Sequence, residues 1–239
     1  MIYCEGITKS YGGVLAVDCV DIYAKKGEVV GIIGSNGAGK TTLFNIISGF
    51  DTQSGGDIYL KTGGKKICIN KMRPYKLAKL GIGRTFQNVR LFDDMTVYQN
   101  VLAGALGTGN SEAAVLDILE KIGLERIRDS FAKSLPYGDR KLTELARCVA
   151  SGARLLLLDE PAAGLNESET DKLGGVLKLL ISKYELTVLL IEHNIDFIMG
   201  LCTRLYAMDL GKVIGEGLPG NVIADQKVVD AVFGGEKNT

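Results

Sequence analysis

The sequence predicts an α/β fold in which buried parallel strands are covered by helices. Three apolar runs of strand length, GEVVGIIG, RLLLLDE and LTVLLIEH, end in glycine or in charged residues, as buried strands do. Helical spacing in two later segments supplies the cover. The apolar positions of these segments are Leu173, Val176, Leu177, Leu180 and Ile181, and then Ile195, Ile198, Met199 and Cys202.

The strand patterns stop between about Asn88 and Ala153, where helical patterns replace them. This change predicts a helical subdomain at residues 88–153, inserted into an α/β core made of residues 1–87 and 154–239. Further on, RLYAMDLGKVIGEG indicates two short strands around a glycine-bearing turn, and the last twenty residues indicate short helices with a polar tail. Two apolar faces are expected in the inserted part: Ala113, Leu116, Leu119 and Ile122, and then Leu142, Leu145, Ala146 and Val149.

The composition excludes a disordered chain, because 46% of the 239 residues are hydrophobic and 23% are charged. The 28 basic residues balance 28 acidic ones, so no global field would attract nucleic acid and no such partner is expected. We find neither a signal-peptide pattern nor an apolar run near the ~18 residues of a membrane span, which predicts a cytosolic chain. The five scattered cysteines are expected to be small core residues: Cys4, Cys19, Cys68, Cys148 and Cys202.

A phosphate-binding loop is predicted at GSNGAGKTT, residues 34–42, which matches G-x-x-x-x-G-K-[ST] between a strand and a helical segment. In such a loop backbone N–H groups close around phosphate oxygens, Lys40 reaches the β- and γ-phosphates, and Thr41 offers its hydroxyl to Mg²⁺. The alternative is a glycine-rich turn without a ligand. The expected contacts to a nucleoside triphosphate are Ser35, Asn36, Gly37, Ala38, Gly39, Lys40, Thr41 and Thr42.

Charged residues follow two of the buried strands. Asp159 can hold Mg²⁺ through water, and Glu160 can orient or deprotonate an attacking water, although an exposed acidic turn before Pro161 is the alternative. His193, the single histidine, ends another strand; it is either structural or placed to polarise the γ-phosphate. Because ligands sit at the carboxyl ends of parallel strands, we expect these side chains to share one crevice with Lys40.

Four more motifs complete a resemblance that covers almost the whole chain. Together with the phosphate loop, the Asp159-Glu160 pair and His193, the motifs that carry this resemblance are, in chain order, KSYGGVLAVDCV, RTFQNVRLF, LPYGDR and AAGLN. The sequence resembles the ATP-binding subunits of ABC transporters. The resemblance implies a P-loop NTPase (ABC ATPase) α/β core with a mostly parallel sheet, an N-terminal antiparallel β part and the inserted helical subdomain. It also implies binding of ATP and Mg²⁺.

The resemblance assigns roles to several further residues. Tyr11 would stack on adenine, and Gln87 would be a catalytic Mg²⁺ ligand that senses the membrane subunit. The D-loop would be Gly164, Leu165 and Asn166. Each has a plainer alternative: Tyr11 as a core aromatic, Gln87 as a surface residue, and Asn166 as the cap of the following helix.

The motif LPYGD departs from the usual signature of this family, Leu-Ser-Gly-Gly-Gln, whose helix points at the γ-phosphate held by a partner subunit. Leu135 and Gly138 match it. Pro136 supplies neither the hydroxyl nor the N–H of the serine, Tyr137 replaces a glycine, and the carboxylate of Asp139 would repel phosphate. We therefore expect an asymmetric pair of ATP sites, formed with a second, non-identical ABC ATPase.

Four longer stretches, GRTFQNVRLFDDMTVYQNV, YGDRK, DEPAAGLN and LLIEHN, resemble the branched-chain amino acid importer ATPase with the degenerate signature. Urea importer and lipopolysaccharide-export ATPases are related, and the segment after Val101 is shorter than in the amino acid type. The resemblance implies an ATPase at the cytoplasmic face of the cell membrane, two polytopic permease subunits and, indirectly, an extracytoplasmic substrate-binding protein. A P-loop kinase and a non-transport ABC ATPase acting on ribosomes or DNA are the competing interpretations.

Overall fold

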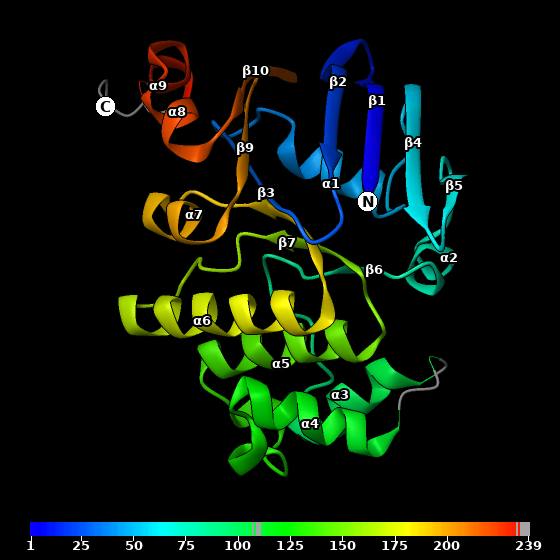
Figure 1. Cartoon of the computed structure of the whole chain (residues 1–239), viewed down its shortest axis with the longest axis vertical. Coiled ribbons are helices and arrows are strands. Elements are labelled where there is room, and N and C mark those ends of the chain that lie inside the picture. Colours follow the sequence, from blue (N-terminus) through cyan, green and yellow to red (C-terminus); the bar gives the residue numbers. More distant parts are fainter. Residues whose placement is uncertain (107, 109–110, 233, 235–239) are drawn as a thin grey trace.

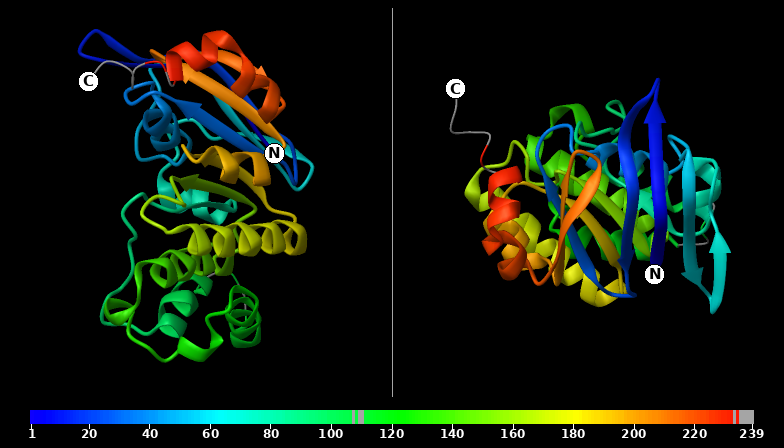
Figure 2. Two further views of the ribbon diagram at one scale, coloured as in Figure 1. Left: turned by 90° about the vertical axis from the view of Figure 1, so that its left-hand side faces the viewer. Right: turned by 90° about the horizontal axis from the view of Figure 1, so that it is seen from above.

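The computed structural model describes residues 1–106, 108, 111–232 and 234, and places two β-sheets above a group of helices (Figure 1). The N-terminal sheet is antiparallel, in the order β2-β1-β4-β5. Its strands lie side by side when the molecule is seen from above (Figure 2). They are β1 (Ile2–Tyr11), β2 (Val14–Ala24), β4 (Gly55–Thr62) and β5 (Lys65–Cys68).

The central sheet of the described residues has the order β10-β9-β3-β8-β7-β6. All of its pairings are parallel except that of β10 with β9. The expected α/β architecture with an antiparallel N-terminal part is therefore confirmed. The strands are β3 (Val29–Gly34), β6 (Ile82–Arg84), β7 (Leu155–Asp159), β8 (Thr187–Ile191), β9 (Arg204–Asp209) and β10 (Lys212–Gly217).

Helices cover both faces of the central sheet. The helix that begins at Lys40 lies between the two sheets, and the helices of residues 97–201 lie on the opposite face (Figures 1 and 2). The α-helices are α1 (Lys40–Ile47), α2 (Pro74–Lys79), α3 (Val97–Ala105), α4 (Glu112–Ile122), α5 (Tyr137–Ala150), α6 (Glu167–Tyr184), α7 (Ile195–Leu201), α8 (Pro219–Ala224) and α9 (Gln226–Val232). Two 3₁₀ turns, η1 (Glu125–Ile127) and η2 (Ala132–Ser134), precede α5.

The central sheet separates two hydrophobic cores because successive side chains of a strand point to opposite faces. In β7, Leu155 and Leu157 join α1 and the antiparallel sheet, whereas Leu156 and Leu158 pack against the helices of the other face. Residues of α3, α4 and α5 belong to the same cluster as those of α6 and α7. The inserted helices therefore share a continuous core with the sheet.

Two expected helix faces are partly wrong. In α4 the buried residues are Val115, Ile118, Leu119 and Ile122, so Ala113 and Leu116 face solvent. The buried residues have the full i, i+3, i+4, i+7 spacing of one helix face. The expected residues were instead spaced every three positions, so that set reaches from the buried face round to the solvent. In α7, Phe197 and Leu201 are buried, while Met199 is exposed. The faces expected in α5 and α6 are confirmed, with Ile181 partly buried.

The cysteine expectation is confirmed for Cys4, Cys148 and Cys202, which are buried, and wrong for Cys19 and Cys68, which are exposed. Cys19 lies where β2 has a positive φ of 52°, and Cys68 ends the edge strand β5. Part of the short segment after Val101, at residues 107 and 109–110, and the polar tail at 235–239 lie outside the described residues. Among the helices described, none has both the length and the apolar character that a membrane span requires.

Candidate active site

The predicted phosphate loop connects the fully buried strand β3 to α1. Helix α1 starts at Lys40, with Gly39 as its N-cap at φ 97°, without a side-chain cap and without an acidic residue in its first turn. A Cβ atom at Gly39 would lie 2.3 Å from the carbonyl oxygen of Ala16, so only glycine fits there. Uncapped N–H groups at a helix start suit an anion, and the loop therefore fits a phosphate group.

Lys40 lies over this loop. Its Nζ atom donates hydrogen bonds to the carbonyl oxygens of Gly34, at 2.6 Å, and Ser35, at 2.9 Å. Burial lowers the pKa of Lys40, while the charges of Glu160 and Asp159 act in the opposite direction. The ammonium group is thus held where phosphate oxygens can compete for its protons.

The structure brings together the three residues that were predicted to be catalytic. Glu160 accepts a hydrogen bond from Nε2 of Gln87 through Oε2, at 2.8 Å, and its Oε1 lies 3.2 Å from Nε2 of His193. Glu160 follows β7 with a φ of 49°, and its N–H donates to the carbonyl oxygen of Ile191 at 2.9 Å. The carboxylate therefore stands between the Gln87 segment and the end of β8.

The turn after β8 depends on a residue that the sequence did not single out. Glu192 is buried, and its carboxylate accepts hydrogen bonds from the N–H groups of Ala162, His193 and Asn194 at 2.8, 2.7 and 3.2 Å. It fastens the segment after β7 to the segment after β8. These hydrogen bonds of Glu192 therefore help to keep Glu160 and His193 close together.

Asp159 forms an ion pair that sequence reasoning missed. Its Oδ2 atom lies 3.1 Å from Nη2 of Arg84 at the end of β6, and the two side chains are only 8% and 7% exposed. Arg84 also donates to Asn45 and Ser48 of the α1 region, both at 2.7 Å. Burial raises the pKa of Asp159, and Arg84 opposes the shift. Arg84 closes a short strand just as Asp159 does, but no local spacing in the sequence pairs the two residues.

Thr41, Gln87 and Asp159 are the candidate metal ligands. Within the described residues no group of three His, Cys, Asp or Glu side chains could hold a metal ion. Mg²⁺ is commonly bound by one or two carboxylates together with waters and substrate phosphates, so this sparse oxygen set fits Mg²⁺ bound along with a nucleotide.

Tyr11 ends β1 with 48% of its surface exposed, so the alternative of a core aromatic is wrong. Its hydroxyl donates a hydrogen bond to Asp51, and Nζ of Lys9 lies 4.6 Å from the ring centroid. Stacking on adenine stays a prediction.

The degenerate signature forms the start of α5. Pro136 is the N-cap and makes no side-chain capping bond, while Asp139 lies in the first turn, 3.6 Å from Nζ of Lys172. The Tyr137 hydroxyl donates to the carbonyl oxygen of Gln87 at 3.4 Å, and a Cβ atom at Gly164 would meet the Tyr137 ring at 3.1 Å. The signature residues thus contact the Gln87 segment and the AAGLN turn of their own chain.

The AAGLN turn leads into α6. Asn166 accepts a hydrogen bond from the N–H of Glu169 and donates its own N–H to the Glu169 carboxylate, both at 3.0 Å, which is a capping box. The helix-capping alternative for Asn166 is confirmed. A D-loop role for Gly164, Leu165 and Asn166 is compatible with it and stays a prediction.

Comparison with known proteins places this geometry in a family. Residues 17–163 match the family model described as "ABC transporter". The high-affinity branched-chain amino acid transport ATP-binding protein LivG of Salmonella typhimurium is 36% identical, with 98% of each chain covered. BraF of Pseudomonas aeruginosa, with the same description, is 37% identical, with 96% of each covered.

A solved structure agrees with these relatives. The ATP-binding cassette MJ1267 of an ABC transporter superposes with a TM-score of 0.87, at 32% identity and over 97% of this chain and 98% of that one. The chain belongs to the ABC transporter family and is one of its ATP-binding, ATP-hydrolysing cassettes. The resemblance and the fold expected from the sequence are confirmed.

Proposed function

We propose that this chain powers the import of branched-chain amino acids by hydrolysing ATP on a membrane transporter. The observation that carries the proposal is the meeting of Gln87, Glu160 and His193 at the carboxyl ends of the strands beside the phosphate loop. The substrate class rests on similarity to LivG and BraF, because transported solute does not contact a cassette of this kind. Urea import and lipopolysaccharide export are the competing assignments.

The chemistry we propose is attack of water on the γ-phosphorus of ATP, with cleavage of its bond to the bridging oxygen. Ser35 to Thr42 bind the phosphates, and Lys40 pairs with their charge. Thr41, Gln87 and, through water, Asp159 would hold Mg²⁺, which when bound would add positive charge beside the phosphate oxygens. Glu160 orients the water and accepts its proton, and His193, whose Nε2 atom lies 3.2 Å from Oε1 of Glu160, contacts the γ-phosphate.

The partner we propose is a second, non-identical ABC ATPase. This chain's Lys40, Asp159 and Glu160 would face an intact signature of that partner. The partner's phosphate loop would face residues 135–139 here, where Pro136 has no N–H to donate. The site built on this chain's own phosphate loop would therefore carry most of the turnover.

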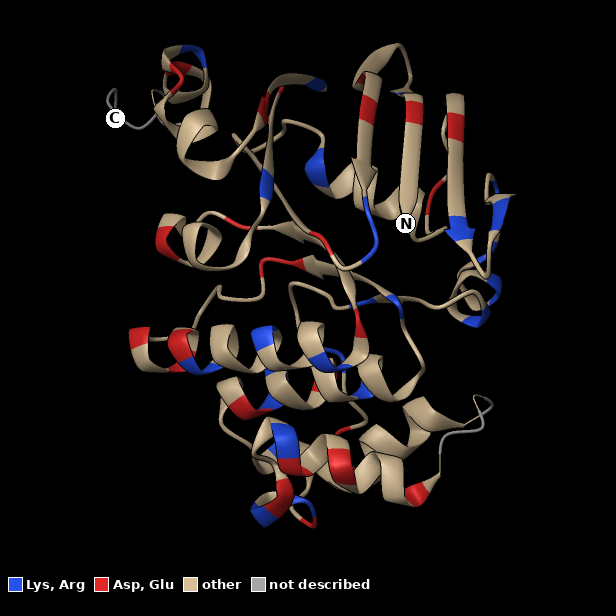
Figure 3. Ribbon diagram, in the orientation of Figure 1, with Lys and Arg blue, Asp and Glu red and all other residues tan. Residues whose placement is uncertain are grey.

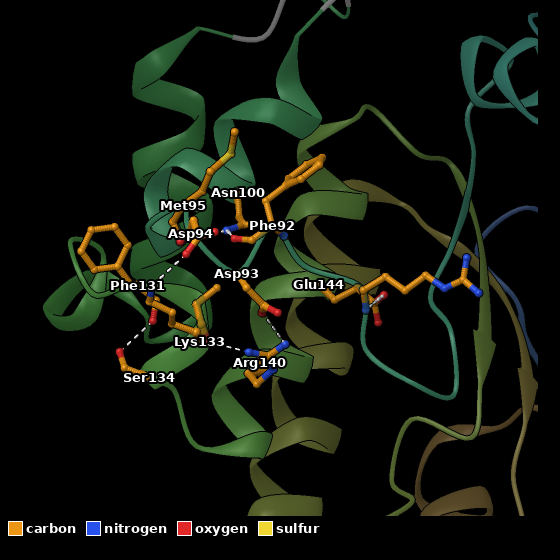
Figure 4. Close-up of polar contacts among 12 residues, drawn as sticks. Phe92, Asp93, Asp94, Met95, Asn100, Phe131, Lys133, Ser134, Arg140 and Glu144 are labelled. Carbon is orange, nitrogen blue, oxygen red and sulfur yellow. Dashed lines mark hydrogen bonds and ion pairs between the residues drawn. The ribbon is translucent and has the colours of Figure 1, made fainter.

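We propose that the permease subunits contact residues 88–153, the helical subdomain that the sequence predicts. The exposed apolar side chains there include Phe92 at 52%, Met95 at 39% and Phe131 at 50%. Their segments are held by side-chain bonds of Asn100 to the carbonyl oxygens of Phe92 and Met95, and by a Lys133–Asp94 ion pair (Figure 4). Exposed apolar groups on segments held by such bonds suit a protein contact.

We place the assembly at the cytoplasmic face of the cell membrane, with two polytopic permeases and an extracytoplasmic substrate-binding protein that does not contact this chain. The Lys and Arg residues are interspersed with Asp and Glu along the described chain (Figure 3), and no nucleic-acid partner is proposed. This even distribution also disfavours the ribosome- or DNA-directed alternative.

Gentle detergent solubilisation of native membranes and capture through a tag after Thr239 test the assembly. Mass spectrometry should identify two different polytopic subunits and a second ATPase whose signature is intact. Recovery of this chain with only itself and one kind of membrane subunit, or with ribosomes, would contradict the proposal.

Uptake measurements test the substrate. Cells that lack this chain should lose high-affinity uptake of labelled leucine, and the Glu160→Gln variant should not restore it. Normal leucine uptake with lost urea uptake would assign the chain to the urea type instead.

A further inference from the structure

One face of α5 contacts both segments that position the proposed catalytic groups. Tyr137, Lys141 and Glu144 follow the spacing i, i+4, i+7 and therefore lie on the same side of this helix. Nζ of Lys141 also lies 5.2 Å from the centroid of the Tyr137 ring. All three side chains make contacts within their own chain.

Lys141 is bound to the backbone of the proposed general base. It is 7% exposed, and Nζ donates hydrogen bonds to the carbonyl oxygens of Glu160, at 3.0 Å, and Pro161, at 2.7 Å. Glu160 has the left-handed φ of 49°, which is strained for a residue with a side chain and persists only where its surroundings fix it. The Lys141 ammonium on one side and Ile191 on the other supply that fixation.

Glu144 and Tyr137 bind the segment that carries Gln87. Glu144 is 2% exposed, and its Oε1 atom accepts the N–H of Arg90 at 3.1 Å. The Tyr137 hydroxyl donates to the carbonyl oxygen of Gln87 at 3.4 Å. The same helix face thus holds the backbone of Gln87 and the backbone of Glu160, whose side chains meet at 2.8 Å.

A buried ammonium group is an expensive way to fill space, because it must lose its water. Burial lowers the pKa of Lys141, although the charges of Glu192, Glu144 and Glu160 oppose this shift. Two carbonyl acceptors satisfy only part of its hydrogen-bonding capacity. An apolar side chain of the same length would fill the site without this penalty, so the donor itself is what distinguishes lysine here.

We propose that Lys141 is a positioning residue for Glu160, and that α5 sets the geometry between Glu160 and the Gln87 segment within its own chain. The signature helix, which the family uses towards the partner's nucleotide, would then also act on its own site. A displacement of the Gln87 segment would reach the Glu160 backbone through one rigid helix. This inference rests on the proposed role of Glu160 in hydrolysis.

The test compares steady-state ATP hydrolysis by the assembled transporter, purified with this chain carrying Lys141→Met, Lys141→Gln or Lys141→Arg. Methionine removes the donor and keeps the length, and we expect kcat to fall about 10- to 100-fold, the effect of losing a charge-assisted hydrogen bond. The KM for ATP should stay within about twofold, because the phosphate loop is untouched. Arginine, which keeps charged donors, should restore most of kcat.

Lys178→Met is the matched control, because Lys178 lies exposed on α6 and the same chemical change there should leave kcat unaltered. If the methionine variant does not fold, Lys141→Gln takes its place, since its shorter amide cannot reach both carbonyls and should lower kcat in the same range. Thermal unfolding of each variant measures folding independently of rate.

Combination with Glu160→Gln separates the possible failures. If Lys141 acts through Glu160, Lys141→Met should add little to the loss already caused by Glu160→Gln. The same factor in both backgrounds, or an unchanged kcat in Lys141→Met, would overturn the inference. An unchanged kcat in Glu160→Gln alone would instead overturn the proposed role of Glu160.

Discussion

The start of α1 and the start of α5 are two helix N-termini in one chain that differ in what they offer to phosphate. Gly39 and Lys40 open α1 without a side-chain cap, and a lysine lies over the loop. Pro136 opens α5 without an N–H group, and Asp139 adds a carboxylate to its first turn. The difference supports the proposal that this chain binds its own nucleotide fully and contacts its partner's nucleotide weakly.

Part of the unfavourable charge at the start of α5 is offset by a neighbouring lysine. Lys172 lies 3.6 Å from Asp139 and offsets some of its charge. Tyr137, which stands where the family has a glycine, is engaged with the Gln87 segment and the AAGLN turn. Tyr137 and Asp139 therefore both make contacts within their own chain.

The largest effect is expected on the α1 side, at the buried Arg84–Asp159 pair. Arg84→Met leaves the Asp159 carboxylate without its counter-charge and should lower the free energy of unfolding by about 3 to 5 kcal/mol at pH 7.5. The pKa of Asp159, already raised by burial, should rise further, so the loss should shrink as acid protonates the carboxyl group. Denaturant unfolding at several pH values measures this.

A double variant, Arg84→Met with Asp159→Asn, is the control for that prediction. With no buried charge left unpaired, it should regain much of the lost stability. A double variant as unstable as Arg84→Met alone, or a loss that grows towards low pH, would show that the ion pair is not the cause.

Lys40→Met should weaken ATP binding by this chain about 10- to 100-fold, because one charge-assisted contact of about 1.5 to 3 kcal/mol is removed. Isothermal titration with a non-hydrolysable ATP analogue measures the affinity, and thermal unfolding checks that the fold is kept. Lys172→Met, next to the signature, should leave this affinity within about twofold. Similar losses of ATP affinity in the two variants would contradict the proposed difference in phosphate binding between the starts of α1 and α5.

Pro136→Ser restores a hydroxyl and an N–H to the signature and should strengthen the weaker interface by up to about tenfold, as one added charge-assisted hydrogen bond allows. Single-turnover hydrolysis at the partner's site, with this chain inactivated by Glu160→Gln, is the measurement. No change in that rate would mean that the missing donors do not limit the weaker site.

The smallest effect is expected far from both helix starts, between α4 and α6. Hydrogen bonds from Lys121 and Lys183 lower the pKa of Asp117 to about 2, so this stabilisation is present above the unfolded-state value and is lost as pH falls towards 2. The group is exposed to solvent, and Asp117→Asn should cost no more than about 1 kcal/mol at neutral pH. Denaturant unfolding should show the difference between the variant and the parent chain shrinking as pH falls through 2, and a difference that stays constant over this range would contradict the prediction.

The sequence predicted the residues at strand ends and missed those that reach the site through tertiary contacts. Lys40 was found from the phosphate-loop pattern, and Asp159, Glu160 and His193 were found from their places at the ends of buried strands; both rules need only local patterns. Arg84 obeys the same rule, but its partner lies 75 residues away and no local spacing announces it.

Helix periodicity was similarly informative and similarly limited. It located α4 and α7, but it assigned some of their residues to the wrong face. Leu116 and Met199 are apolar and were expected to be buried, yet both are exposed. Lys141 and Glu144 are charged residues inside the buried part of α5. Their role depends on which carbonyl and N–H groups approach the helix, which a single sequence does not reveal.

The difference between the two helix starts is tested most directly by mutating one catalytic base at a time in the assembled transporter. Glu160→Gln in this chain should reduce ATP hydrolysis about 100- to 10,000-fold, the usual effect of removing a general base. The corresponding substitution in the partner ATPase should leave most of the activity, because its site faces the Pro136-bearing signature. Equal losses from the two substitutions would contradict the asymmetry.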